Sequence, residues 1–109
     1  MELRTNAFDG GVVVELEGEL DIAAVPVAEA ALRRVEEDQP PLLLMDMRGL
    51  GFIDSSGLRL VLAADRRARD DGRRFAIIPG PEPVQRVFRV TGVEQRLEQI
   101  AAVPGTPAV

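Results

Sequence analysis

The sequence contains no cysteine, histidine, tryptophan or tyrosine, and each absence removes a class of chemistry. Without cysteine the chain forms no disulfide and has no reactive thiol, a composition that fits a cytosolic protein. Without histidine as well, a zinc site would have to use carboxylates alone, and neither a Ser-His-Asp nor a Cys-His triad can be assembled. General acid–base catalysis would depend on Asp, Glu and Arg. We therefore expect a protein that is not an enzyme and that has no catalytic residue, metal or cofactor.

Long hydrophobic runs are missing too. Residues 42–45 are apolar but are followed at once by Asp46, so this run is far too short to span a bilayer. Residues 1–11 lack the apolar segment of a secretory signal. With 109 residues, of which 46% are hydrophobic, the chain has the length of one domain and enough apolar side chains for a core. We expect a cytoplasmic protein without direct membrane insertion, with a domain over residues 1–102 and a flexible tail over 103–109.

The net charge is −5, and it is distributed unevenly along the chain. Residues 1–38 carry ten acidic residues against three arginines, a balance of −7, whereas residues 59–74 carry six arginines against three aspartates, a balance of +3. A nucleic-acid binder needs a basic face that neutralises phosphates, so the acidic total disfavours a nucleic-acid partner. We interpret the arginines of residues 59–74 as a solvent-exposed helix face.

The first third of the chain predicts a hairpin followed by a helix. Two alternating, β-branched runs, residues 2–8 and 12–17, flank the turn signal Asp-Gly-Gly and are typical of a β-hairpin. Gly18 is expected to interrupt the second strand. Apolar residues then recur at helical spacing over residues 25–38, with a proline in the first turn, and the proline pair at 40–41 ends this helix.

The middle of the chain predicts a buried strand, a loop and a second helix. Residues 42–47 form a short apolar run bounded by turn signals, which is typical of a buried central strand. Residues 48–51 contain two glycines and are expected to form a loop, and residues 52–53 a short extended piece. A helix is predicted over residues 56–71. Its expected core stripe consists of Leu58, Val61, Leu62, Ala64 and Ala68.

The last third predicts a strand over residues 74–79, a helix over 83–91 and one further short element, strand or helix, over 97–101. Strands separated by helices imply parallel pairing with right-handed crossovers, which with the first hairpin gives a mixed sheet. The four phenylalanines are expected in the core, namely Phe8, Phe52, Phe75 and Phe88.

Asp54-Ser55-Ser56-Gly57 is the most chemically distinctive motif, because it joins a predicted strand to the start of a predicted helix. Each of its first three residues is able to cap the helix by accepting a hydrogen bond from an unpaired backbone N–H. A phosphate on a serine there would bring about −1.5 to −2 charges to the positive end of the helix dipole. From the spacing alone, a plain helix cap is the commoner explanation of such a motif.

Two stretches of this sequence resemble a known family. Residues 52–92, FIDSSGLRLVLAADRRARDDGRRFAIIPGPEPVQRVFRVTG, resemble the signature region of the STAS family, the anti-sigma factor antagonists. Residues 18–34, GELDIAAVPVAEAALRR, resemble that family's segment leading into its first helix. The similarity covers about residues 8–101 and depends on GELD, the apolar strand ending in Asp46, DSSGL, the turn at Gly72 and FRVTG in combination.

The resemblance implies a single-domain α/β STAS-like fold, with a mixed sheet, an N-terminal hairpin and helices following the later strands. It also implies a bacterial transcription regulator that works by partner switching. The unphosphorylated protein binds an anti-sigma factor that is also a serine kinase, and so frees the sigma factor. Phosphorylation ends this binding, and a serine phosphatase reverses it. The phosphorylated residue implied by the resemblance is Ser56, with Ser55 as the runner-up. An alternative is a STAS scaffold, or a soluble subunit of a membrane transport complex, without a phosphorylation switch.

Further site residues come from the resemblance and from helix geometry. The resemblance places Asp21 near the phosphoserine, although a loop or capping role would also explain this residue. Arg59, Leu60 and Ala63 follow Ser56 at three, four and seven positions and so share its helix face. Leu60 is expected to be an exposed interface anchor, or else an ordinary partly buried leucine. The predicted partner-binding surface therefore comprises Asp21, Asp54, Ser55, Gly57, Arg59, Leu60 and Ala63.

Two other patterns in the sequence resemble known sites but are incomplete. Gly49 and Gly51 precede a helix, but the third glycine of a dinucleotide-binding fingerprint would fall at Asp54, where an acid opposes a pyrophosphate. Asp46 follows an apolar strand as a phospho-acceptor aspartate would, but an early acidic pair for magnesium is not evident and lysine is absent. We expect Asp46 to be an ordinary strand-end residue.

Overall fold

The alternation of strand and helix patterns in the sequence is realised in the computed structural model, which describes residues 1–105. The elements in chain order are β1 (Glu2–Phe8), β2 (Gly11–Leu20), α1 (Val25–Glu37), β3 (Leu42–Ile53), α2 (Ser55–Asp70), β4 (Arg74–Ile78), α3 (Glu82–Val90), a 3-10 turn η1 (Val93–Arg96) and β5 (Glu98–Gln99). The further element expected at residues 97–101 is therefore a two-residue strand. The three helices lie within one residue of their expected bounds.

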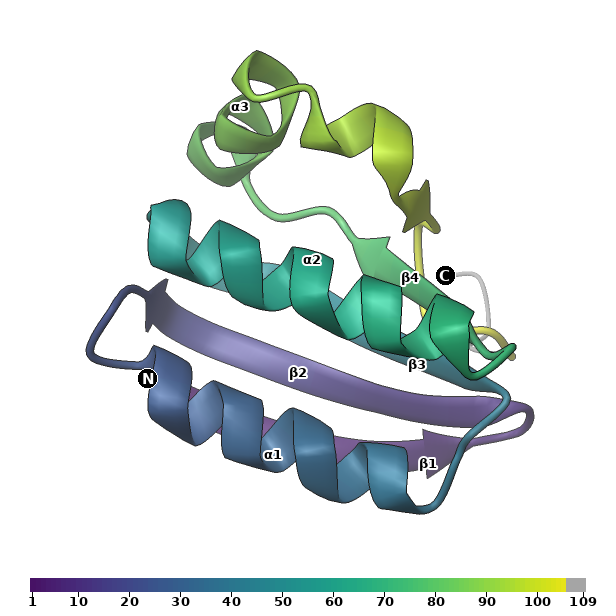
Figure 1. The fold of residues 1–109 in the computed structure, drawn as a ribbon. Helices are drawn as coiled ribbons and strands as arrows, with labels where there is room; N and C mark the ends of the chain where they lie inside the picture. Colours follow the sequence, from purple (N-terminus) through teal and green to yellow (C-terminus); the bar gives the residue numbers. More distant parts are fainter. Residues whose placement is uncertain (106–109) are drawn as a thin grey trace.

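The strands form one five-stranded sheet in the order β1-β2-β3-β4-β5. β1 and β2 pair antiparallel as a hairpin, and the three remaining pairs are parallel. Figure 1 shows α1 and α2 side by side along one face of the sheet. α3 follows β4 in the chain and packs against β3. The expected α/β fold, with a mixed sheet, an N-terminal hairpin and helices after the later strands, is confirmed.

The core has two parts, because successive residues of a strand face opposite sides of the sheet. On the helix-covered face, Leu43 and Met45 of β3 join the large cluster that packs against the helices. On the other face, Leu42 and Leu44 belong to a smaller cluster that Ile100 and Val103 partly cover.

The last part of the expected tail, residues 106–109, lies outside the described residues.

β3 is twice as long as expected, because residues 48–51 continue the strand instead of forming a loop. β2 likewise continues through Gly18 to Leu20, and the β2–β3 pairing shows register shifts on either side of Glu17 and Gly18. At Gly49 a Cβ atom would lie only 2.8 Å from the carbonyl oxygen of Leu16. The glycines that suggested a loop therefore allow irregular pairing and close approach of two strands.

Asp46 lies in the middle of β3 and does not end a strand, which corrects the expectation from the sequence. Its side chain is 8% exposed. Its Oδ1 accepts hydrogen bonds from the backbone nitrogen and the Nε of Arg48, both at 3.0 Å, and its Oδ2 accepts from Nη2 at 2.8 Å. Burial acts to raise the pKa of Asp46, but the hydrogen bonds and positive charge of Arg48 outweigh it and hold the pKa below its ordinary value.

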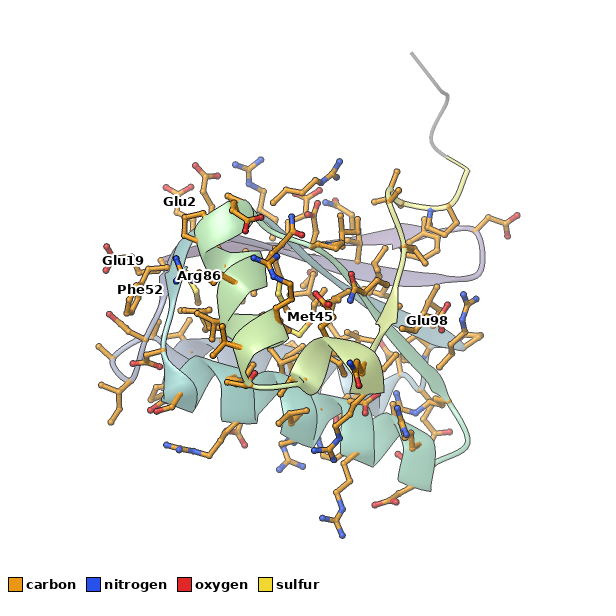
Figure 2. The ribbon with its side chains drawn as sticks, turned by 90° about the horizontal axis from the view of Figure 1, so that it is seen from above. Glu2, Glu19, Met45, Phe52, Arg86 and Glu98 are labelled. Carbon is orange, nitrogen blue, oxygen red and sulfur yellow. The ribbon has the colours of Figure 1, made fainter. Side chains whose placement is uncertain are left out.

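Three of the four phenylalanines follow the expectation and one does not. Phe75 and Phe88 are buried, and Phe8 packs against the smaller core cluster. Phe52 is 48% exposed, so its expected place in the core is wrong. It lies beside its register partner Glu19 near the ends of β2 and β3 (Figure 2). The next residue, Ile53, faces the core, and the alternation of strand side chains turns Phe52 outward.

None of the helices within residues 1–105 combines the length and the apolar character that a membrane crossing requires.

Candidate functional site

The two predicted motifs, GELD and DSSG, meet at one edge of the sheet. β2 and β3 are parallel, so the turn after β2 and the start of α2 after β3 leave the sheet at the same edge. The backbone nitrogen of Ile22 donates a hydrogen bond to Oδ2 of Asp54 at 3.1 Å, and the backbone nitrogen of Asp54 donates to the carbonyl of Leu20 at 3.3 Å. The structure therefore joins two segments that are 32 residues apart in sequence.

Asp54 is the residue that caps α2. Its backbone is extended, with φ −107° and ψ −175°, and its Oδ1 accepts from the backbone nitrogen of Gly57 at 2.9 Å. Of the three residues that the sequence offered as caps, the aspartate takes this role. The cap explanation of the motif thus applies to Asp54, and the hydroxyl of Ser56 is not used for capping.

Gly57 lets the first turn of α2 pack closely on the end of β2. A Cβ atom at this position would lie 2.4 Å from the carbonyl oxygen of Leu20 and 2.9 Å from Cγ1 of Ile53. Both contacts are too short for any residue larger than glycine unless the helix moves. Gly57 is itself buried, and it holds the start of the helix in place next to the two serines.

Ser55 is exposed and Ser56 is half-buried, and both lie on the first turn of α2. The Oγ of Ser56 accepts a long hydrogen bond of 3.4 Å from Nη2 of Arg59. Ser56 also lines a shallow hollow of about 350 Å³ between α1 and α2, together with Ile22, Val25, Glu29, Arg59, Leu60 and Ala63. The three residues that helical spacing grouped with Ser56 therefore do lie around it.

Leu60 is not the exposed anchor that the sequence suggested. Only 5% of it is exposed, and it belongs to the large core cluster. Helical spacing shows which residues share a face, but this side of α2 packs against α1, which buries Leu60. Arg59 and Ala63 on the same face are exposed.

Asp21 shapes the turn that contacts Asp54. Its Oδ1 and its carbonyl oxygen both accept hydrogen bonds from the backbone nitrogen of Ala24 at 3.0 Å. Asp21 therefore fixes the backbone that presents Ile22. The carboxylate also lines a second hollow of about 440 Å³, together with Met1, Gly18, Glu19, Ala23, Ala24 and Val27.

Exposed apolar side chains at this edge were not identified from the sequence. Ile22 is 73% exposed and lines the hollow at Ser56, whereas Val27 is 61% exposed and lines the separate hollow at Asp21. The exposed apolar side chain of Ile22 beside Ser56 is available for contact with a protein partner. The sequence does contain a signal for this surface: an isoleucine directly follows the aspartate of GELD, before the first helix.

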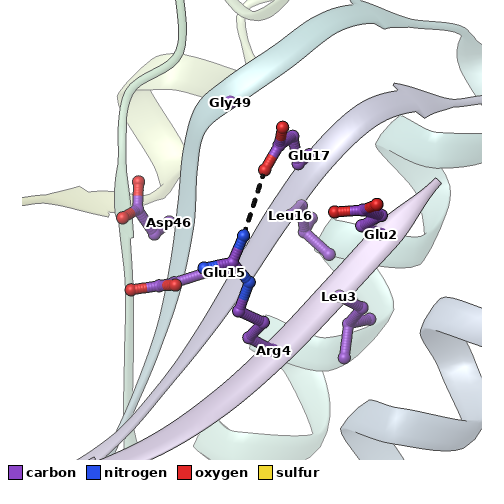
Figure 3. A pocket seen from close by; sticks show the side chains of 8 residues that line it. All are labelled: Glu2, Leu3, Arg4, Glu15, Leu16, Glu17, Asp46 and Gly49. Carbon is purple, nitrogen blue, oxygen red and sulfur yellow. Dashed lines mark ion pairs between the residues drawn. The ribbon is translucent and has the colours of Figure 1, made fainter.

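A separate hollow of about 220 Å³ lies along β1, β2 and β3 and contains none of the predicted site residues (Figure 3). Its charged lining consists of Glu2, Arg4, Glu15, Glu17 and Asp46. Arg4 forms an ion pair with Glu17 at 3.5 Å, and Asp46 forms an ion pair with Arg48. The motifs GELD and DSSG do not meet at this acidic hollow, whereas they do meet near Ser56.

Comparison with known proteins gives consistent matches over nearly the whole chain. Residues 3–101 match the family model described as "Mlab, STAS domain". The anti-sigma-B factor antagonist of Staphylococcus aureus is 23% identical over 94 residues, which is 86% of this chain and 87% of that protein. A crystal structure of an anti-sigma factor antagonist from Mycobacterium paratuberculosis aligns with a TM-score of 0.85 and 25% identity, over 94% of this chain and 86% of that one.

The antagonist SpoIIAA has been solved in two states that both resemble this chain. Its unphosphorylated form aligns with a TM-score of 0.76 and 25% identity, over 91% of this chain and 88% of that one. The phosphorylated form of the Bacillus protein aligns with a TM-score of 0.70 and 24% identity, over 91% of each chain.

Proposed function

The chain belongs to the STAS domain family, and we propose that it is an anti-sigma factor antagonist controlled by phosphorylation of Ser56. The relatives named above are anti-sigma factor antagonists, and one of them, SpoIIAA, has been solved with and without phosphate. In this proposal the protein acts in the bacterial cytoplasm as a regulatory binding protein and not as an enzyme.

One observation carries the proposal: the Ser56 hydroxyl lies on the first turn of α2 without serving as its cap. Asp54 supplies the cap, so the Ser56 Oγ has only its long hydrogen bond with Arg59 to lose on modification. Ser56 lies in a surface hollow, where a kinase reaches it without unfolding the helix. The apolar Ile22 and the exposed Ser55 lie next to it and supply a docking surface.

The proposed cycle has a binding state and a released state. The unmodified protein binds an anti-sigma factor serine kinase and thereby frees the sigma factor. In the kinase reaction the Ser56 Oγ forms a bond to the γ-phosphorus of ATP, the bond to the ADP oxygen breaks, and the hydroxyl proton passes to a base of the kinase. The new phosphate brings about −1.5 to −2 charges to the docking surface, and the complex dissociates. A serine phosphatase then transfers the phosphoryl group to water and restores the hydroxyl.

The site residues contribute in two ways. Asp21, Ser55, Arg59 and Ala63 contact the partner, together with Ile22. Three other residues hold the first turns of α2 in position. Asp54 caps the helix, Gly57 permits its close packing and Leu60 anchors it in the core.

Phosphosite mapping tests the proposal directly. The protein is incubated with its cognate anti-sigma factor kinase and ATP, and the phosphate is located by mass spectrometry. We expect one phosphate, on Ser56, its loss in Ser56→Ala and its retention in the matched control Ser55→Ala. Titration calorimetry should show that Ser56→Asp binds the kinase at least tenfold more weakly than the unmodified protein.

A different set of results would favour the alternative, a docking subunit of a membrane transport complex. These results are an unmodified Ser56 after incubation and equal partner binding by Ser56→Ala and Ser56→Asp. Either result would count against the switch while leaving the family assignment unchanged.

A further inference from the structure

The helix N-terminus at Ser56 is already occupied by a carboxylate. The side chain of Asp54 accepts hydrogen bonds from the backbone nitrogens of Gly57 and Ile22, so these donors are not available to a second anion. A phosphate on Ser56 would therefore meet a negative charge at the place where the sequence alone suggested a positive helix end. A basic side chain nearby would offset this repulsion and stabilise the phosphorylated state.

Arg59 is the basic residue in position to do this. Its Nη2 atom lies 3.4 Å from Oγ of Ser56, and the two residues are separated by one helical turn. Among the residues that line the hollow at Ser56 within the described chain, Arg59 is the one basic residue. The phosphate oxygens lie two bonds beyond Oγ, so the guanidinium reaches them without movement of the backbone. Its exposed side chain is also free to rotate toward them.

The next charged groups around Ser56 are carboxylates, together with one arginine that is already paired with one of them. Asp54 faces it from the cap of α2, and Glu29 faces it from α1 across the hollow. Glu29 is itself paired with Arg33 at 3.5 Å. Asp21 directly precedes Ile22, whose backbone nitrogen donates a hydrogen bond to Asp54. A phosphate would be repelled by these carboxylates and attracted by Arg59.

We propose that Arg59 binds the phosphate of phosphorylated Ser56 through a charge-assisted hydrogen bond, and so acts as the residue that holds the modified state. This inference deepens the phosphorylation proposed above and rests on it. A guanidinium pairs well with phosphate oxygens because its N–H donors lie in one plane. When Arg59 turns to the phosphate, the docking surface gains a dianion and loses its exposed arginine at the same time.

Titration of the phosphate tests this role. Phosphoserine is incorporated at position 56 during translation, and the phosphate pKa is measured by ³¹P NMR between pH 4 and 8. Its second pKa is ordinarily about 6. Arg59 favours the dianion, so Arg59→Gln should raise this pKa by about 0.2–0.7 pH unit, the range expected for an exposed ion pair. Arg59→Lys should keep most of the effect.

Two matched variants complete the test. Arg66→Gln removes a charge from an exposed arginine two turns further along α2 and should leave the phosphate pKa unchanged. Glu29→Gln should lower it, because a nearby negative charge is removed. Identical titration curves for the phosphorylated parent, Arg59→Gln and Arg66→Gln would overturn the proposal. Since the phosphate is installed during translation, this result does not depend on a kinase, and failure of the proposed switch would appear separately in the phosphosite mapping.

Discussion

Ile22 and Asp54 are joined by a hydrogen bond of 3.1 Å from the backbone nitrogen of the first to Oδ2 of the second. The other oxygen of the same carboxylate accepts from the backbone nitrogen of Gly57. One side chain therefore fixes both the turn that presents Ile22 and the helix turn that presents Ser56. Any change at Asp54 alters the two halves of the docking surface together.

Asp54→Ala should lower the free energy of unfolding by about 1–2 kcal/mol, the usual result of removing a helix cap. Asp54→Asn keeps an oxygen acceptor for Gly57 and should lose less. Urea denaturation measures both values, with Ser55→Ala as the control, because Ser55 is exposed and caps nothing. If Ser55→Ala lost about 1–2 kcal/mol of stability and Asp54→Ala lost none, the cap would have been assigned to the wrong residue.

Gly57→Ala should destabilise the protein by about 1–3 kcal/mol, although alanine is the better helix former. The reason is the predicted 2.4 Å contact of the new Cβ with the carbonyl oxygen of Leu20. Gly51→Ala is the matched control, since its Cβ would have its nearest neighbour at 4.0 Å. We expect that control to stay within about 0.5 kcal/mol. Equal stability of the two variants would mean that α2 does not need the close approach.

Asp46→Asn should destabilise the protein by about 1–2 kcal/mol at pH 7, because it weakens the charged hydrogen bonds from Arg48. The pKa of Asp46 is lowered in the folded protein, so its charge contributes stability above the unfolded pKa of about 3.9. That contribution is lost as the pH falls below about 4 and through the folded pKa. Unfolding curves of both proteins should differ at pH 7, and the difference should shrink as the pH falls below about 4; a constant difference at all pH values would argue against the ion pair as the cause.

Ile22→Ser should weaken binding to the anti-sigma factor at least tenfold and leave stability nearly unchanged. The side chain is 73% exposed, so its apolar surface contributes to docking and little to the core. Val90→Ser is the matched control, because Val90 is 77% exposed but lies on α3 and does not line the hollow at Ser56. Calorimetric titration measures both affinities. Equal affinities would place the docking surface elsewhere.

Local patterns predicted most of the fold. Alternation around the Asp-Gly-Gly turn indicated the first hairpin, and helical spacing bounded by prolines indicated α1, each to within a few residues. These features depend on neighbours in sequence, which a single chain reveals. The placement of Ser56 on the first turn of α2 followed from the same kind of local signal.

The errors concern relationships between distant segments. Leu60 shares a helix face with Ser56, but its burial depends on α1, which the spacing along α2 does not reveal. Gly49 indicated a loop, but its absent side chain is needed because the backbone of β2 passes close by. Asp46 is the exception, because its partner is local: Arg48, two residues further along β3, satisfies the carboxylate and allows it to lie within the strand.

The covering of the second sheet face by Ile100 and Val103 has a practical consequence for shortening the chain. A protein truncated after Gln99 would retain every helix and all five strands, yet it would leave Leu42 and Leu44 more open to water. Such a bare apolar sheet surface favours self-association in concentrated solution. Removal of the last ten residues would thus reduce solubility while the sheet and the helices remained.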